Sequence, residues 1–201
     1  MLLELPLRPV IVRLLAFGAL LSAGCDRQKA AEPQGERAAN AAAPATLYPS
    51  GRLDRSHAGA PAPTVQFEDP GGEPASLSDF RGRPLLVNLW ATWCPPCVVE
   101  MPSLDRLAAR EGERVQVLAL SQDIDGREKV TNFFAARNFA QLEPYLDGDL
   151  AVMTALRVDT LPTTILYDAE GREVWRMTGM AEWDGERAGR LLAEASPATA
   201  R

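Results

Sequence analysis

Residues 85–97 read LLVNLWATWCPPC, an almost continuous apolar run that ends in two cysteines separated by two prolines. The run Leu85–Trp90 is typical of a central β-strand that is covered on both faces. From Pro95 to about Arg110, apolar residues recur at helical spacing, which predicts an amphipathic α-helix. The two cysteines therefore stand where a buried strand gives way to a helix.

Strand and helix patterns alternate on either side of this junction. We expect strands at 65–67, 85–90, 115–120 and 142–146, followed by a β-hairpin of 163–167 and 173–177. We expect a helical turn at 77–80 and helices at 95–110, 126–137, 149–156 and 183–195, with Asp149 as the cap of the helix that it begins. This order predicts an α/β fold, a three-layer α/β/α sandwich around a mixed sheet.

Composition and charge exclude several classes of protein. The chain has 201 residues, 46% of them hydrophobic, and a formal net charge of −6. No basic run interrupts this acidity, which argues against nucleic acid as a partner. The single histidine, His57, lies in a segment rich in small and polar residues, so we interpret it as a solvated side chain rather than a catalytic one.

The amino terminus has the pattern of an export signal. A basic leader, a short apolar core and small residues precede Cys25, and together they predict a signal peptide at 1–24. Leu21–Cys25 resembles a bacterial lipobox, in which the cysteine is lipidated; ordinary cleavage that leaves a free thiol is the alternative. We expect a lipid-anchored flexible tether at 25–60, a globular domain at 61–196 and a loose tail at 197–201.

The helix position of the cysteines favours thiol chemistry. Cys94 would occupy the N-cap and Cys97 the third helical position, with Pro95 and Pro96 at positions that tolerate a missing amide. The helix N-terminus carries about half a positive charge, which favours thiolate over thiol. We expect Cys94 to be exposed and nucleophilic, with the Cys97 amide donating to its sulfur. Cys97 would then resolve a mixed disulfide.

Other uses of a cysteine pair fit less well. A zinc site needs four ligands, and only Cys25 and His57 remain. Covalent haem needs a histidine directly after the second cysteine, where Val98 stands. A purely structural disulfide is possible, but closing so short a loop contributes little stability. We therefore predict a redox-active disulfide between Cys94 and Cys97, with no metal and no cofactor.

The stretch 85–97, with Val98–Pro102 after it, resembles the TlpA/ResA/CcmG group of membrane-tethered, extracytoplasmic thioredoxin-like proteins. The resemblance extends over roughly Ala62 to Ala195 and includes Thr160–Thr163, which is similar to the cis-proline loop of that group. It implies a thioredoxin-like fold with a central αβ insertion at about Ser121–Gly148. It also implies a place on the periplasmic face of the cytoplasmic membrane.

The resemblance implies roles for particular residues. Glu100 resembles the family glutamate, and we expect it to relay a proton for Cys97; the alternative is a surface glutamate paired with an arginine. Asn88 stands where thioredoxins have a buried aspartate. Pro162 is expected to be cis. The residues expected to bind substrate are Trp93, Pro95, Pro96, Leu161 and Pro162.

The function implied is that of a thiol-disulfide oxidoreductase. By resemblance, its substrates are disulfides in apocytochrome c or in a copper-centre protein, and a membrane electron donor of the DsbD/CcdA type restores the dithiol. Two alternatives remain open. A peroxiredoxin-type peroxidase needs a threonine three residues before its cysteine, whereas Thr92 lies two before Cys94. A Cu(I) chaperone could bind the metal through the two thiolates.

Overall fold

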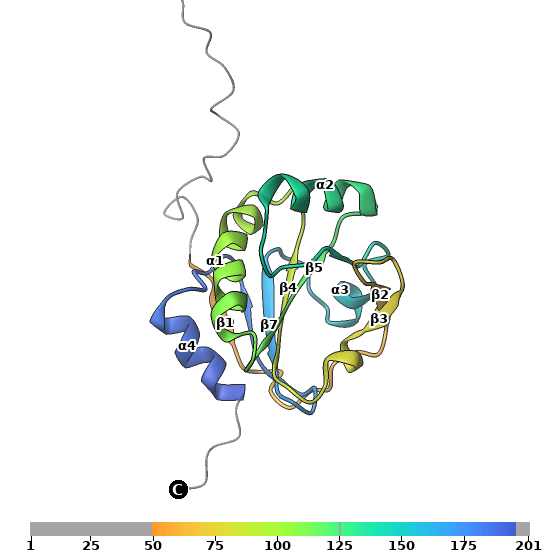
Figure 1. Ribbon diagram of the computed structural model, residues 1–201. Helices are drawn as coiled ribbons and strands as arrows, with labels where there is room; N and C mark the ends of the chain where they lie inside the picture. The colour runs from red at the N-terminus through yellow and green to blue at the C-terminus, as the bar shows by residue number, and fades with distance from the viewer. Residues whose placement is uncertain (1–49, 125, 196–201) are drawn as a thin grey trace, which may run out of the picture. The chain divides into compact units, whose positions relative to one another are not determined.

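The computed structural model describes residues 50–124 and 126–195, which form a mixed sheet with helices on both faces (Figure 1). The sheet has eight strands in the order β1-β8-β7-β4-β5-β6-β2-β3. The strands are β1 Arg52–Asp54, β2 Gln66–Glu68, β3 Pro74–Ser76, β4 Leu85–Trp90, β5 Gln116–Ser121, β6 Tyr145–Leu146, β7 Thr163–Tyr167 and β8 Glu173–Thr178. The helices are η2 Leu77–Phe80, α1 Pro95–Glu111, α2 Arg127–Arg137, α3 Ala151–Ala155, α4 Glu186–Leu192 and η3 Ala193–Ala195.

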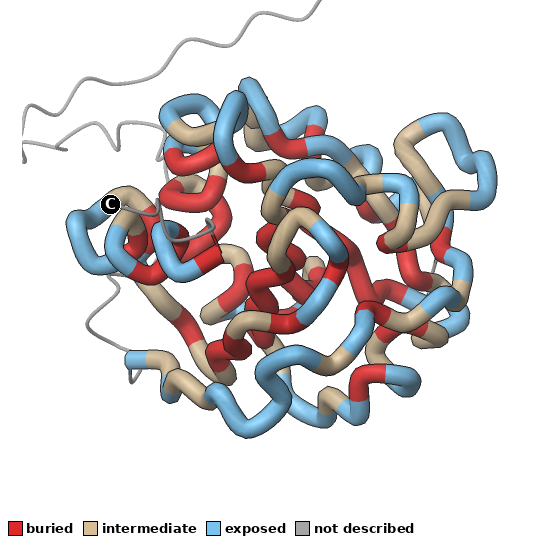
Figure 2. The backbone as a smooth tube through the Cα atoms, turned by 90° about the horizontal axis from the view of Figure 1, so that it is seen from below, coloured by how far each residue is buried: buried red, intermediate tan, exposed pale blue. Residues whose placement is uncertain are grey.

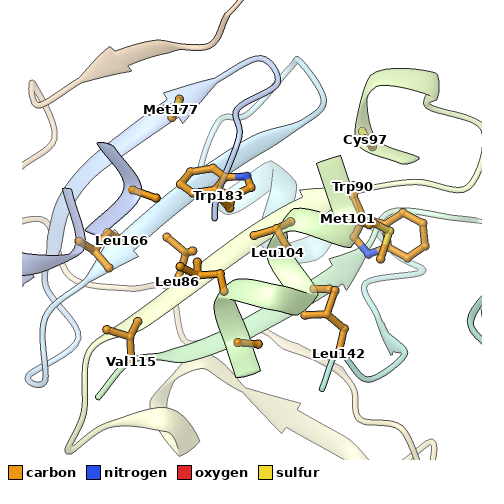
Figure 3. Close-up of a cluster of buried hydrophobic side chains, with 14 of the residues drawn as sticks. Leu86, Trp90, Cys97, Met101, Leu104, Val115, Leu142, Leu166, Met177 and Trp183 are labelled. Carbon is orange, nitrogen blue, oxygen red and sulfur yellow. The ribbon is translucent and has the colours of Figure 1, made fainter. Parts of the chain in front are cut away.

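Strand β4 forms the centre of the sheet, as its apolar sequence predicts. It pairs in parallel with β5 and antiparallel with β7, and all six of its residues are buried. Leu86 and Trp90 face a core cluster that includes side chains of α1, α2 and α4 (Figure 3). Val87 and Leu89 face a second cluster that includes side chains of α3 and η2.

The two clusters lie on opposite faces of the sheet, so the sheet and the helices on its two sides form the three layers of the predicted sandwich. Figure 2 shows buried backbone running through the middle of the molecule, with exposed segments around it. Parallel pairing of β4 with β5 and of β5 with β6, together with antiparallel hairpin β7–β8, confirms the mixed sheet. Helix α2 and strand β6 lie within the expected insertion at 121–148. No helix among the described residues is long and apolar enough to cross a membrane.

The domain begins earlier than the predicted boundary at residue 61. Strand β1 pairs with β8, and Gly59 N–H donates to the Glu173 carbonyl oxygen at 2.7 Å. His57 therefore belongs to an ordered turn next to the sheet, although it is exposed. The prediction failed because main-chain pairing with β8 requires no apolar pattern. The expected signal peptide at 1–24, the lipidation site Cys25 and the tail at 197–201 lie outside the described residues.

The predicted cap of α3 is also wrong. The N-cap residue is Leu150, and the carboxylate of Asp147, not of Asp149, accepts hydrogen bonds from the first helical amides, those of Ala151, Val152 and Met153, at 2.8–3.1 Å. Asp147 is 1% exposed, so its carboxylate gains the three bonds in place of water. The last helix is shorter than expected, since α4 starts at Glu186 and Trp183 is a buried core residue in the loop before it.

Candidate active site at the start of helix α1

Cys94 and Cys97 form a disulfide at the first turn of α1, with their Cα atoms 5.3 Å apart. Cys94 is the N-cap, as predicted, and Pro95 and Pro96 occupy the first two helical positions. The first helical hydrogen bond runs from the Val98 amide to the Cys94 carbonyl at 3.1 Å. The strand-to-helix junction thus places both sulfur atoms at the positive end of the helix.

Cys94 is less accessible than the sequence indicated. In this disulfide form Cys94 is 5% exposed and Cys97 is fully buried, so Cys94 is still the more accessible of the two. The expected hydrogen bond from the Cys97 amide to the Cys94 sulfur is absent: the side chain of the N-cap residue Cys94 accepts no hydrogen bond from the helix. A disulfide sulfur is only a weak acceptor, whereas the prediction concerned a thiolate.

The two tryptophans near the disulfide have different surroundings. Trp90 is fully buried and packs against Phe133 and Phe134, with ring centroids 5.0 and 5.8 Å away. Trp93 is 61% exposed. The side chain directly before Cys94 is therefore a large apolar surface that the fold leaves open to solvent.

The Leu161–Pro162 peptide bond is cis, as expected. Pro162 is buried and directly precedes β7, whose first residue Thr163 pairs with Leu89 near the end of β4. The cis-proline loop therefore lies at the carboxyl end of β4, from which the chain continues to Cys94. The Pro162 carbonyl accepts a hydrogen bond from Gly179 N–H at 2.8 Å, which fixes the loop against β8.

Glu100 lies one helical turn after Cys97 and is 2% exposed. Its carboxylate accepts hydrogen bonds from Asn88 Nδ2 at 2.7 Å, the Ala181 amide at 2.9 Å and Trp183 Nε1 at 3.4 Å. Burial raises the pKa of Glu100 to about 7, although these three bonds oppose the rise. The alternative of a surface glutamate paired with an arginine is therefore wrong.

Asn88 connects Glu100 to the neighbouring strand. Its Nδ2 also donates to Thr164 Oγ1 on β7 at 2.9 Å. Its Oδ1 is buried without a hydrogen-bond partner among residues 50–124 and 126–195. A neutral amide thus stands beside the buried glutamate, where a carboxylate would repel it.

Sequence reasoning missed Asp123, a buried carboxylate that binds the segment before Cys94 through Thr92. A usable signal was present. Asp123 lies two residues after the end of β5, and the carboxyl ends of parallel β4 and β5 meet at one edge of the sheet. The described part of the chain holds no group of three or more histidine, cysteine, aspartate or glutamate side chains arranged to bind a metal.

The comparisons with known proteins agree with this geometry. Residues 57–191 match the sequence profile of the Redoxin family. Thiol-disulfide oxidoreductase ResA of Bacillus subtilis is 33% identical over 122 residues, which cover 60% of this chain and 67% of the relative. ResA of Geobacillus kaustophilus is 35% identical over 132 residues, 64% of this chain and 74% of the relative.

Solved structures show the same fold. The exposed lipoprotein thioredoxin Etrx1 of Streptococcus pneumoniae superposes with a TM-score of 0.57 at 23% identity, over 65% of this chain and 98% of the other. StoA of Bacillus subtilis gives a TM-score of 0.53 at 21% identity, over 68% and 100%. These likenesses confirm the thioredoxin-like α/β fold. Together with the family match and the ResA relatives, they establish that the chain belongs to the Redoxin family and is a ResA/CcmG-like thiol:disulfide oxidoreductase.

Proposed function

We propose that the chain works as a reductase of protein disulfides. The Cys94 thiolate attacks one sulfur of a substrate disulfide, forming a mixed disulfide and releasing the first substrate thiolate. The Cys97 thiolate then attacks the Cys94 sulfur, which closes the Cys94–Cys97 disulfide and releases the second substrate thiolate. Two electrons pass from the pair to the substrate. The observation that carries this proposal is the disulfide at the start of α1, with its more accessible sulfur on Cys94.

Glu100 acts in this scheme as a proton acceptor for Cys97. The Cys97 thiol must lose its proton before it can attack, and it is fully buried without contact with solvent. Glu100 lies three residues further along α1, so the two side chains share one helix face. Its pKa of about 7 allows it to take up and release a proton near neutral pH.

The residues around Cys94 provide the substrate-binding surface in this proposal. Trp93 and Pro95 are exposed, whereas Pro96 and Leu161 are half-buried. An extended substrate segment could pair with the main chain beside the cis Pro162, as peptides do when they add to a sheet edge. Trp93 would then cover the apolar side chains next to the substrate cysteine.

We propose disulfides of apocytochrome c or of a copper-centre assembly protein as substrates, and a DsbD/CcdA-type membrane protein as the electron donor. The resemblance of 85–102 to the TlpA/ResA/CcmG group supports this choice. We also propose that the chain acts outside the cytoplasm, held to the membrane by a lipid on Cys25. The lipobox-like sequence supports this, and the structurally similar Etrx1 is described as a lipoprotein.

Trapping of a mixed disulfide tests the proposal. The reduced full chain is mixed in detergent with an oxidised Cys-X-X-Cys-His peptide, and products are separated without reductant. All forms carry Cys25→Ser, so that only the pair remains as thiols. Cys97→Ser should accumulate a covalent complex through Cys94, while Cys94→Ser should form none. Reduction of the peptide by Cys94→Ser at the rate of the unchanged pair would contradict the proposal.

A further inference from the structure

Asp123 is a fully buried carboxylate that the proposed chemistry does not use. Its side chain has no exposed surface. Oδ2 accepts hydrogen bonds from the Thr92 amide and from Ser121 Oγ, both at 2.8 Å. Oδ1 accepts one from Thr92 Oγ1 at 2.6 Å and lies 3.4 Å from Lys129 Nζ. Both oxygens are thus committed, and two of the four contacts are to one residue.

That residue belongs to the short segment Ala91–Trp93 between β4 and Cys94. The segment is also held by its main chain: Cys94 N–H donates to the Ala91 carbonyl at 3.1 Å, and Gln122 N–H donates to the Trp90 carbonyl at 2.7 Å. The side chain of Thr92 binds Asp123 in the neighbouring β5–α2 loop. This contact therefore adds a side-chain link between the β5–α2 loop and the segment that precedes Cys94.

The charge of Asp123 points to a geometric role. Burial by itself raises the pKa of Asp123, but the hydrogen bonds from Thr92 and Ser121 and the contact with Lys129 outweigh it and hold the pKa below its ordinary value. The carboxylate is therefore ionised. A negative charge close to the active-site loop opposes formation of a thiolate, so the charge of Asp123 does not itself favour the chemistry of Cys94. The two hydrogen bonds that Asp123 accepts from Thr92 indicate a geometric role instead.

We propose that Asp123 is a positioning residue that acts through Thr92: it fixes the Ala91–Trp93 segment, so that Cys94 stays at the N-terminus of α1 and Trp93 stays exposed beside it. This inference rests on the proposed role of Cys94 as the attacking nucleophile. It assigns the β5–α2 loop, at the start of the insertion, a direct part in the redox site.

Threonine variants test the inference without changing charge. Thr92→Val removes the bond from Oγ1 to Asp123 and keeps the amide, while Thr92→Ser keeps both. The reduced full chain with Cys25→Ser is alkylated with iodoacetamide across a pH series, and mass spectrometry identifies the labelled cysteine. Loss of the helix-terminus interaction corresponds to about a two- to fivefold smaller thiolate share. We therefore expect Thr92→Val to react about two- to fivefold more slowly at pH values below the Cys94 pKa, and Thr92→Ser to restore the rate.

Asp147→Asn is the matched control for stability. Asp147 is equally buried and also accepts main-chain hydrogen bonds, but they belong to α3. This variant should lower the urea midpoint and leave the alkylation profile unchanged. The inference is overturned if Thr92→Val gives the same profile as Thr92→Ser, or if Asp147→Asn shifts the profile as much as Thr92→Val. Labelling of Cys97 instead of Cys94 in the unchanged pair would overturn the proposed function and this inference together.

Discussion

Replacement of Glu100 by glutamine should change how stability depends on pH. The Glu100 carboxylate is 2% exposed and its pKa is raised from 4.5 to about 7, chiefly because burial removes water from the charged form. In the unfolded chain the group has its ordinary pKa. Between these two values the folded protein holds a proton that the unfolded chain has released, so the free energy of unfolding falls as pH rises.

The size of the effect follows from the two pKa values. A tenfold difference in proton affinity is worth about 1.4 kcal/mol, so a pKa raised from 4.5 to about 7 corresponds to about 3 kcal/mol. This stabilisation is complete below pH 4.5, is lost as pH rises through about 7, and changes no further above that. Glutamine has no proton to lose. The Glu100→Gln variant should therefore lack this loss, whatever constant cost its altered hydrogen bonds add.

Urea unfolding of the oxidised protein at pH 5, 6, 7 and 8, followed by circular dichroism, measures the effect. The oxidised form is used because disulfide sulfurs do not titrate. Subtracting the Glu100→Gln curve from that of the unchanged protein removes the contributions of other groups. Glu186→Gln is the control, since that side chain is 95% exposed, and it should leave the pH dependence unchanged. Parallel curves for Glu100→Gln and the unchanged protein would refute the reasoning.

Two further substitutions test the buried polar contacts. Asn88→Asp places a second carboxyl group where Nδ2 now lies 2.7 Å from Glu100. Because two such carboxylates cannot both ionise readily, the free energy of unfolding should continue to fall above pH 7 in the same urea series. A curve that levels off together with that of the unchanged protein would argue against this. Arg176→Met leaves Glu173 buried without the guanidinium that now binds both its oxygens at 2.7 Å, so unfolding in urea should cost about 3–5 kcal/mol less. We expect the second substitution Glu173→Leu to restore most of the lost free energy of unfolding. A decrease of less than about 1 kcal/mol in Arg176→Met would contradict the account.

The parts of the fold that the sequence predicted are those with strong local signals. The apolar run 85–90 indicated a covered strand, and Cys94 was expected at the N-cap because the helix pattern starts at Pro95. Both features are present in the structure. The cis bond before Pro162 was expected from the resemblance of the loop to a known family, since the local sequence alone does not determine it.

The parts that were missed depend on contacts between distant segments. Strand β1 is three residues long and is held by main-chain pairing with β8, which leaves no apolar pattern to detect. Glu100 was expected in the site, but its partners Ala181 and Trp183 come from a loop about eighty residues later. Asp123 was missed because its contact with Thr92 joins segments 31 residues apart, although its place just after a predicted strand was a usable signal.

The reduction potential of the Cys94–Cys97 pair tests the central claim most directly. The full chain with Cys25→Ser is equilibrated in detergent with glutathione buffers of known potential, and the fraction of disulfide is measured by alkylation and mass. The account predicts a single two-electron transition near or below the ~−270 mV of thioredoxin, as a reductase requires. A transition near ~−120 mV would make the pair an oxidant and contradict the proposed direction. Absence of any transition would contradict the redox role itself.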